Sequence, residues 1–140
     1  MMTLGQKQRL FVLLENRWVT WVLARGYELT HGECLRSDEQ AEINALGYTG
    51  RVRLCETIKP FFPVLAEKIL NNGKNSGIRN SLHEEKLAAD WNLFKDGAYL
   101  SRTEDWKEVG EYWETLHPLC RWGGRFGDGN HISLEHNGRK

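Results

Sequence analysis

Two short stretches of this sequence combine residue types that bind metal ions and move protons. The first runs from Ser81 to Asp90 and holds His83 seven positions before Asp90. The second runs from Asp128 to His131 and places an acid three residues before a histidine. A hydrolytic zinc site needs about three protein ligands and an open position for water. His83, Asp90 and His131 would supply two imidazoles and a carboxylate, a donor mixture that zinc accepts.

Each of these residues also has an ordinary structural interpretation. A single histidine at a strand end is most often a hydrogen-bonded residue, and Asp128 between two glycines is typical of a turn. Asp90 interrupts the apolar run from Leu87 to Phe94, where an unpartnered carboxylate would be costly to bury. A metal ion or a cationic group would remove that cost. On a tight turn, the Asp128 carboxylate can reach metal-bound water without being a ligand and act as a general base.

The order and spacing of these residues resemble a known peptidase signature. Ser-x-His, followed by Ala and then Asp, is similar to the signature of the D-alanyl-D-alanine carboxypeptidase-like zinc peptidases. That group includes phage endolysins that cut L-alanyl-D-glutamate bonds in peptidoglycan, and it shares its metal-site architecture with the hedgehog signalling domain. The stretch from Trp122 to His131 resembles the family's second motif, in which an acidic base precedes the last zinc ligand. The likeness covers residues 26 to 136.

The resemblance implies a role for each residue of the two motifs. His83, Asp90 and His131 would be the zinc ligands, and Asp128 would be the catalytic base. The chain departs from the family pattern at Lys86, three residues after His83, where the family usually has glycine. That departure concerns the local backbone and removes no ligand.

Two further polar residues match the family outside the metal ligands. Arg36 resembles its upstream arginine, which pairs with a substrate carboxylate or steadies the developing oxyanion, as a planar charged fork can. The alternative for Arg36 is a surface charge beside a helix. Ser81 would hydrogen-bond substrate or orient the His83 loop, and its alternative is a plain turn serine.

The function that the resemblance implies is that of a zinc metallopeptidase. A phage endolysin of this kind would hydrolyse the L-alanyl-D-glutamate bond of the stem peptide and degrade the bacterial cell wall during host lysis. Two alternatives stay open: a D-alanyl-D-alanine carboxypeptidase with the same metal site, and a non-catalytic zinc-stabilised module that binds cell-wall peptide. We expect a monomer whose partner is bacterial peptidoglycan, with no nucleic acid and no stable membrane insertion. The phage resemblance implies passage from the host cytoplasm to the cell wall and periplasm through a holin-type pore.

Length, composition and charge narrow the class of protein. With 140 residues, 40% hydrophobic and 27% charged, we predict a single catalytic domain over residues 1–140 without a separate cell-wall-binding domain. The 19 basic and 19 acidic residues balance, so overall charge gives no argument for nucleic acid. No apolar run reaches about 18 residues, the length of a membrane helix. Glu15, Asn16 and Arg17 interrupt the N-terminal apolar stretch, which therefore does not resemble a signal peptide.

The three cysteines and six tryptophans suggest packing rather than chemistry. Cys34, Cys55 and Cys120 match no zinc-finger or disulfide spacing, and we expect reduced, partly buried thiols. Most tryptophans are expected in the core, although Trp91 and Trp122 are candidates for stacking on a peptide or glycan.

Hydrophobic periodicity predicts an α+β fold with a small, mostly antiparallel sheet flanked by helices. The resemblance adds a hedgehog or D,D-peptidase-like zinc site to that sheet. The expected helices cover 4–25, 37–45, 60–69 and 103–113, and the first would bury Leu10, Leu13, Leu14, Trp18, Trp21 and Val22. The expected strands cover 27–35, 87–94, 99–100 and 131–135. Residues 47–53 are expected to form a loop, and residues 71–77 to be the most flexible stretch.

Overall fold

The computed structural model describes residues 1–32, 38–72 and 81–140, which belong to two compact units. One unit combines Met1–Leu35 with Leu82–Lys140, and the other is Arg36–Ser81. No shift in composition marks this division in the sequence, and the prediction of one catalytic domain over the whole chain stays a prediction. Among the described residues, no helix has both the length and the hydrophobicity needed to span a bilayer.

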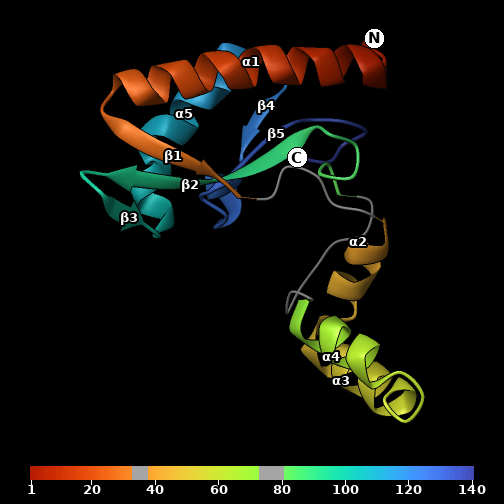
Figure 1. Cartoon of the computed structure of the whole chain (residues 1–140). Helices are drawn as coiled ribbons and strands as arrows, with labels where there is room; N and C mark the ends of the chain where they lie inside the picture. The colour runs from red at the N-terminus through yellow and green to blue at the C-terminus, as the bar shows by residue number, and fades with distance from the viewer. Residues whose placement is uncertain (33–37, 73–80) are drawn as a thin grey trace. The chain divides into compact units, whose positions relative to one another are not determined.

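The first unit has an α+β fold built on a small, open antiparallel sheet of five strands (Figure 1). The strand order is β1-β2-β5-β4, and β3 pairs with β2. The strands are β1 (Tyr27–His31), β2 (Ala88–Lys95), β3 (Ala98–Leu100), β4 (Cys120–Trp122) and β5 (His131–Leu134). The predicted fold class is confirmed at this level, and β4 is the strand that periodicity did not predict, because three residues are too few to show alternation.

Strand β2 is the central strand of the sheet. One of its faces is buried in the core, and the opposite face carries Asp90; we call the latter the polar face. Its last residues pair with β1 and β3, while its first three, Ala88 to Asp90, pair with β5. Side chains alternate between the two faces of a strand. Ala89, Trp91 and Leu93 are buried on the core face, so Asp90 points to the opposite face.

Helix α1 (Leu4–Ala24) covers the core face beside α5 (Lys107–Leu116) (Figure 1). Its start is stabilised by a capping box in which Thr3 and Gln6 exchange side-chain to backbone hydrogen bonds. The residues that it buries are Lys7, Phe11, Leu14, Trp18 and Val22. Leu10 and Trp21 pack at the core edge. The prediction for Leu13 was wrong: this side chain is 51% exposed.

Five of the six tryptophans lie in this core. Trp18 Nε1 donates to the carbonyl of Val109 at 2.8 Å, and Trp113 Nε1 donates to that of Ser133 at 3.1 Å, so these indoles join α1 to α5 and α5 to β5. Trp91 and Trp122 are only 6% and 4% exposed. Neither is therefore available to stack on a substrate, which corrects that expectation.

Two short 3-10 helices, η1 (Thr103–Trp106) and η2 (Gly123–Phe126), complete the first unit. The second unit contains α2 (Asp38–Ala45), α3 (Gly47–Ile58) and α4 (Pro63–Asn72). Residues 47–53, expected as a loop, begin α3 instead. Helix α3 buries Arg51 and Cys55, which are four positions apart and therefore lie on one face of the helix. Most of the stretch 71–77 lies outside the described residues.

Candidate metal centre

Three side chains that are distant in the sequence converge at the polar face of the sheet. Asp90 Oδ1 lies 3.0 Å from His131 Nδ1 and 3.4 Å from His83 Nε2. The two imidazole nitrogens are 3.3 Å apart. His83 and His131 are 4% and 8% exposed, and 14% of the Asp90 side chain is exposed. The structure thus brings together the three residues that the sequence predicted as ligands.

Strand pairing places two of the three candidate ligands opposite each other. Asp90 on β2 and His131 on β5 are direct register partners in the antiparallel ladder. Side chains of such partners point to the same side of a sheet and lie close together. Because both side chains are short, two hydrogen-bonded strands suffice to hold this pair.

A tight turn before β2 positions the third candidate ligand, His83. The amide of Leu87 donates to the carbonyl of Leu82 at 2.9 Å, which closes the turn, and both leucines are buried in the core. The amide of Lys86 donates to the carbonyl of His83 at 3.2 Å. Lys86 has a φ of +56°, a left-handed conformation that favours glycine. The departure from the family pattern at Lys86 therefore falls on a left-handed residue.

Contacts from both ends of the chain hold the His83 turn in place. Gln8 of α1 donates through Nε2 to the carbonyl of Glu85 at 2.9 Å. Arg139 donates through NH2 to both carboxylate oxygens of Glu85, at 2.7 and 2.8 Å. Neither residue was predicted to support the site, because each lies far from Glu85 in the sequence, at a separation of 77 and 54 positions respectively.

The electrostatics of the site favour an ionised carboxylate. Burial acts to raise the pKa of Asp90, but hydrogen bonds and positive charge from His131 and His83 outweigh it and hold that pKa well below its usual range. The group therefore offers one anionic oxygen and two imidazole nitrogens, the donor chemistry of zinc and related transition metals.

The spacing of these donor atoms fits a single metal ion. Tetrahedral ligands about 2.0–2.1 Å from zinc lie about 3.3 Å from one another, and the three observed separations are 3.0, 3.3 and 3.4 Å. Among the described residues, His83 Nδ1 is buried and has no hydrogen-bond partner. His83 is therefore positioned by its turn and by the contacts of its Nε2 atom with Asp90 and His131. The His83, Asp90 and His131 group can hold a metal ion.

Asp128 lies three residues before His131, in the turn that leads into β5, and is exposed. Its amide donates to the carbonyl of Gly123 at 2.9 Å, and its carbonyl accepts from the amide of His131 at 3.2 Å. Asp128 is outside the group of potential ligands. A Cβ on Gly123 would lie 2.3 Å from the Asp128 carbonyl oxygen and 2.8 Å from the Cβ of His131. Glycine at position 123 is therefore what allows this turn to lie against η2.

Two side chains that were not among the predicted site residues, those of Trp122 and Thr103, support the Asp128 turn. Trp122 Nε1 donates to the carbonyl of Gly129 at 2.7 Å. Thr103 donates through Oγ1 to the carbonyl of Gly127 at 3.3 Å. A Cβ on Gly129 would lie 2.7 Å from the Cα of Thr103. The Gly-Asp-Gly sequence is the only signal of such close packing that the sequence offers.

The roles predicted for the other site residues, Ser81 and Arg36, stay predictions. Ser81 is half-buried and precedes His83 by two residues, and its role in substrate binding stays a prediction. Arg36 lies outside the described residues, as does Cys34. Cys55 and Cys120 are buried free thiols, as expected. Burial raises the pKa of Cys120 to about 12, so this thiol is protonated at neutral pH and is no nucleophile.

No family model matches the chain, and no curated protein sequence matches it.

Proposed function

We propose that this chain is a zinc-dependent peptidoglycan peptidase of the D-alanyl-D-alanine carboxypeptidase-like family, with an endolysin's preference for the L-alanyl-D-glutamate bond. The convergence of His83 Nε2, Asp90 Oδ1 and His131 Nδ1 within 3.0–3.4 Å of one another carries the proposal. The resemblance of the two sequence motifs supplies the argument for the peptidase family and for its substrate. On this proposal, the polar face of the sheet is a hedgehog or D,D-peptidase-like zinc site.

Each residue of the site has a task in peptide hydrolysis. His83, Asp90 and His131 would hold zinc, with one position left for solvent. When bound, zinc lowers the pKa of a water ligand toward about 7 and polarises a carbonyl oxygen. The hydrogen-bonded turn of His83 and the β2–β5 ladder hold the ligands in place before the metal arrives, which limits the ordering that binding requires.

Asp128 would move the proton. Its carboxylate takes a proton from the attacking water and then gives a proton to the leaving amine, so the base is regenerated in each cycle. Exposure of Asp128 supports this role, because the carboxylate faces the solvent that supplies the water. Arg36 would pair with a substrate carboxylate or the oxyanion, and Ser81 would hydrogen-bond substrate or orient the His83 turn.

Metal content and product analysis test the proposal together. The purified protein is expected to contain about one zinc per chain, and chelation should lower its melting temperature because the metal binds only the folded state. On purified muropeptides, cleavage should expose a new N-terminal D-glutamate. Release of free D-alanine would instead establish the carboxypeptidase alternative. Zinc-loaded protein that releases neither product would overturn the peptidase assignment.

The non-catalytic alternative differs at Asp128. An Asp128→Ala variant should keep its zinc and lose the ability to lyse outer-membrane-permeabilised cells. If that variant binds zinc and still lyses cells at the wild-type rate, Asp128 is not the base. The location implied by the family, release from the host cytoplasm through a holin-type pore, belongs to the same proposal and is tested by lysis timing with and without a co-expressed holin.

A further inference from the structure

The polar face of the sheet continues along β2 beyond the candidate metal centre. Strand β2 is paired without interruption from Ala88 to Lys95, so every second residue points to the face that carries Asp90. The next two such residues are Asn92 and Phe94, and both are half-buried. Asn92 lies about 7 Å from Asp90 along the strand. A molecule that is bound at the metal centre and extends along β2 therefore meets Asn92 first.

The neighbouring strand holds the side-chain amide of Asn92 in one orientation. Asn92 Nδ2 donates to Oγ1 of Thr30, its register partner on β1, at 3.1 Å, and to the carbonyl of His31 at 3.4 Å. Because a carbonyl only accepts, the second bond determines which end of the amide is the NH2 group. Both hydrogens of Nδ2 are then used, and Oδ1 is the group that remains for a ligand.

The Thr30–Asn92 pair presents one acceptor and one donor. Among the described residues, neither Asn92 Oδ1 nor the hydroxyl hydrogen of Thr30 has a hydrogen-bond partner. Thr30 is exposed and Asn92 is half-buried, so solvent reaches both side chains. An acceptor beside a donor is complementary to the N–H and C=O of one residue in an extended peptide, which point to the same side of the chain.

The pair has a fixed position relative to Asp90. Strand β1 and the residue after it stay against β2 as far as the metal centre, because the amide of Gly32 donates to the carbonyl of Asp90 at 2.8 Å. A Cβ on Gly32 would lie 2.8 Å from that carbonyl oxygen, so glycine permits this close approach. Groups that are held on paired strands lose little conformational entropy when a ligand binds.

The far end of this row of side chains is aromatic. Phe94 and its register partner Tyr99 on β3 have ring centroids 5.3 Å apart, and Tyr99 is 55% exposed. Glu28, opposite Phe94 on β1, accepts a hydrogen bond from the amide of Gly97 at 3.0 Å. The row from Asp90 to Phe94 is about 14 Å long, which is the length of about four residues of an extended peptide.

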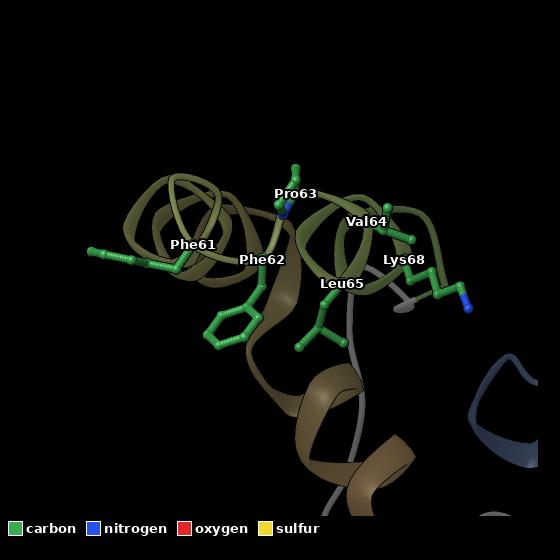
Figure 2. A pocket seen from close by; sticks show the side chains of 6 residues that line it. All are labelled: Phe61, Phe62, Pro63, Val64, Leu65 and Lys68. Carbon is green, nitrogen blue, oxygen red and sulfur yellow. The ribbon is translucent and has the colours of Figure 1, made fainter.

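A surface pocket in the second unit gives no comparable argument for a ligand. Figure 2 shows the residues that line it, which are Phe61, Phe62, Pro63, Val64, Leu65 and Lys68. The exposed lysines there, Lys59 and Lys68, are balanced by exposed Glu56 and Glu67, so charge favours no class of partner. The Thr30–Asn92 pair differs because it adjoins a site whose chemistry specifies what it would bind.

We infer that Thr30 and Asn92 form a peptide-binding subsite beside the metal centre and hold the main chain of a substrate residue close to the scissile bond. Asn92 Oδ1 accepts a hydrogen bond from the N–H of that residue, and the Thr30 hydroxyl donates to its C=O. The inference rests on the proposed function, since a peptidase must hold the chain on at least one side of the bond that it cleaves. It adds the residues that hold the chain and the extended conformation in which they hold it.

Calorimetric titration of the zinc-loaded full chain tests the subsite. The long probe is an N-acetylmuramoyl tetrapeptide and the short probe is the dipeptide L-alanyl-D-glutamate, each with its L-alanyl-D-glutamate amide replaced by a CH2–NH group that cannot be hydrolysed. Asn92→Ala should weaken binding of the long probe by about 3- to 10-fold, the effect of one or two hydrogen bonds, and leave the short probe unaffected. With the hydrolysable muropeptide, KM should rise while kcat and zinc content stay near wild type.

Conservative variants separate the hydroxyl from the fold of the strand. Thr30→Val removes the hydroxyl, keeps the shape of the side chain and should weaken binding of the long probe, whereas Thr30→Ser should bind like wild type. The matched control is Lys95→Ala, an exposed position on β2 whose side chain points away from the face of Asn92; it should also bind like wild type. Urea denaturation checks that each variant is folded. If Asn92→Ala unfolds, Thr30→Val replaces it, because a β-branched residue suits a strand.

Three outcomes would overturn the inference. Wild-type protein could fail to bind the long probe, or Asn92→Ala could bind that probe as tightly as wild type. Asn92→Ala could also lose the same factor with both probes, which would indicate a disturbed Asp90 rather than a lost subsite. Failure of the proposed function looks different: wild-type protein would prefer the long probe to the short one in a manner that depends on Asn92, yet cleave no muropeptide. That result would refute the peptidase and support the subsite.

Discussion

His131 Nδ1 lies 3.0 Å from Asp90 Oδ1 because the two residues are opposite each other on β5 and β2. Forty-one positions separate them in the sequence, and a ladder of main-chain hydrogen bonds fixes their spacing. The third donor, His83, comes from a turn whose flanking leucines are buried in the core. A metal site built in this way depends on the packing of the whole first unit.

The Asp90→Asn substitution tests the anionic ligand. We expect metal affinity to fall by more than the about 10–100-fold that is typical when an outer hydrogen-bond partner of a ligand is removed. The neutral amide keeps the shape of the side chain but offers no charge. Zinc retention during dialysis against a graded chelator measures the change. Asp96→Asn, on the exposed turn between β2 and β3, is the control, and equal zinc retention by the two variants would contradict the ligand role of Asp90.

The Lys86→Gly substitution should stabilise the protein. A left-handed conformation costs a residue with a side chain about 1–2 kcal/mol, and glycine recovers part of this while losing about 0.5–1 kcal/mol to its more flexible unfolded state. We expect a net gain of up to about 1 kcal/mol in the free energy of unfolding, measured by urea denaturation. Lys107→Gly, in the first turn of α5, is the control and should destabilise. A loss of stability in Lys86→Gly would show that the positive φ is not strained.

The Gly129→Ala substitution should impair catalysis more than metal binding. The added Cβ would lie 2.7 Å from the Cα of Thr103, so the turn that carries Asp128 must shift. We expect turnover of muropeptides to drop by about 100-fold, as a displacement of about 1 Å can cause, while zinc content stays near wild type. Gly5→Ala on α1 should leave turnover unchanged, because a Cβ added there would lie 3.8 Å from the side chain of Arg9, an ordinary contact distance. Full activity in Gly129→Ala would remove the Asp128 turn from the mechanism.

Glu15 should make the protein less stable as the pH rises. Burial raises the pKa of Glu15, against a hydrogen bond from Trp91 Nε1 at 3.3 Å and the nearby charge of His31. Its folded pKa therefore lies above the unfolded one, so its contribution to stability is complete below the unfolded pKa and is lost as the pH rises through the folded pKa.

The Glu15→Gln variant removes this titration and can still accept the hydrogen bond from Trp91. Relative to wild type, it should be more stable at pH 7 than at pH 4, measured by urea denaturation with chelator present at both pH values. Glu104→Gln, at an exposed position, should show a smaller change with pH. An identical pH dependence for Glu15→Gln and wild type would contradict the raised pKa.

Local patterns in the sequence predicted much of the secondary structure and singled out the three residues that converge in the candidate metal centre. The period of apolar residues marked α1, and the capping residues at Thr103 to Asp105 marked the start of the segment that leads into α5. Leu13 was misassigned to the core because it is apolar and adjacent to Leu14, and only the position of the sheet decides which side of a helix is buried. The start of α3 at residues 47–53 was not predicted, because its apolar residues show no clear helical period and the helix is stabilised by packing against α4.

The sequence by itself determined which residues have metal-binding chemistry, because imidazole and carboxylate groups at a recognisable spacing can be read from the chain. Only the tertiary structure decided that His83, Asp90 and His131 meet within 3.4 Å. It also decided that Gln8 and Arg139 hold the His83 turn, and that Trp91 and Trp122 are buried in the core. The reason is physical: strand register and core packing join residues tens of positions apart, and no local pattern records which distant partner each will find.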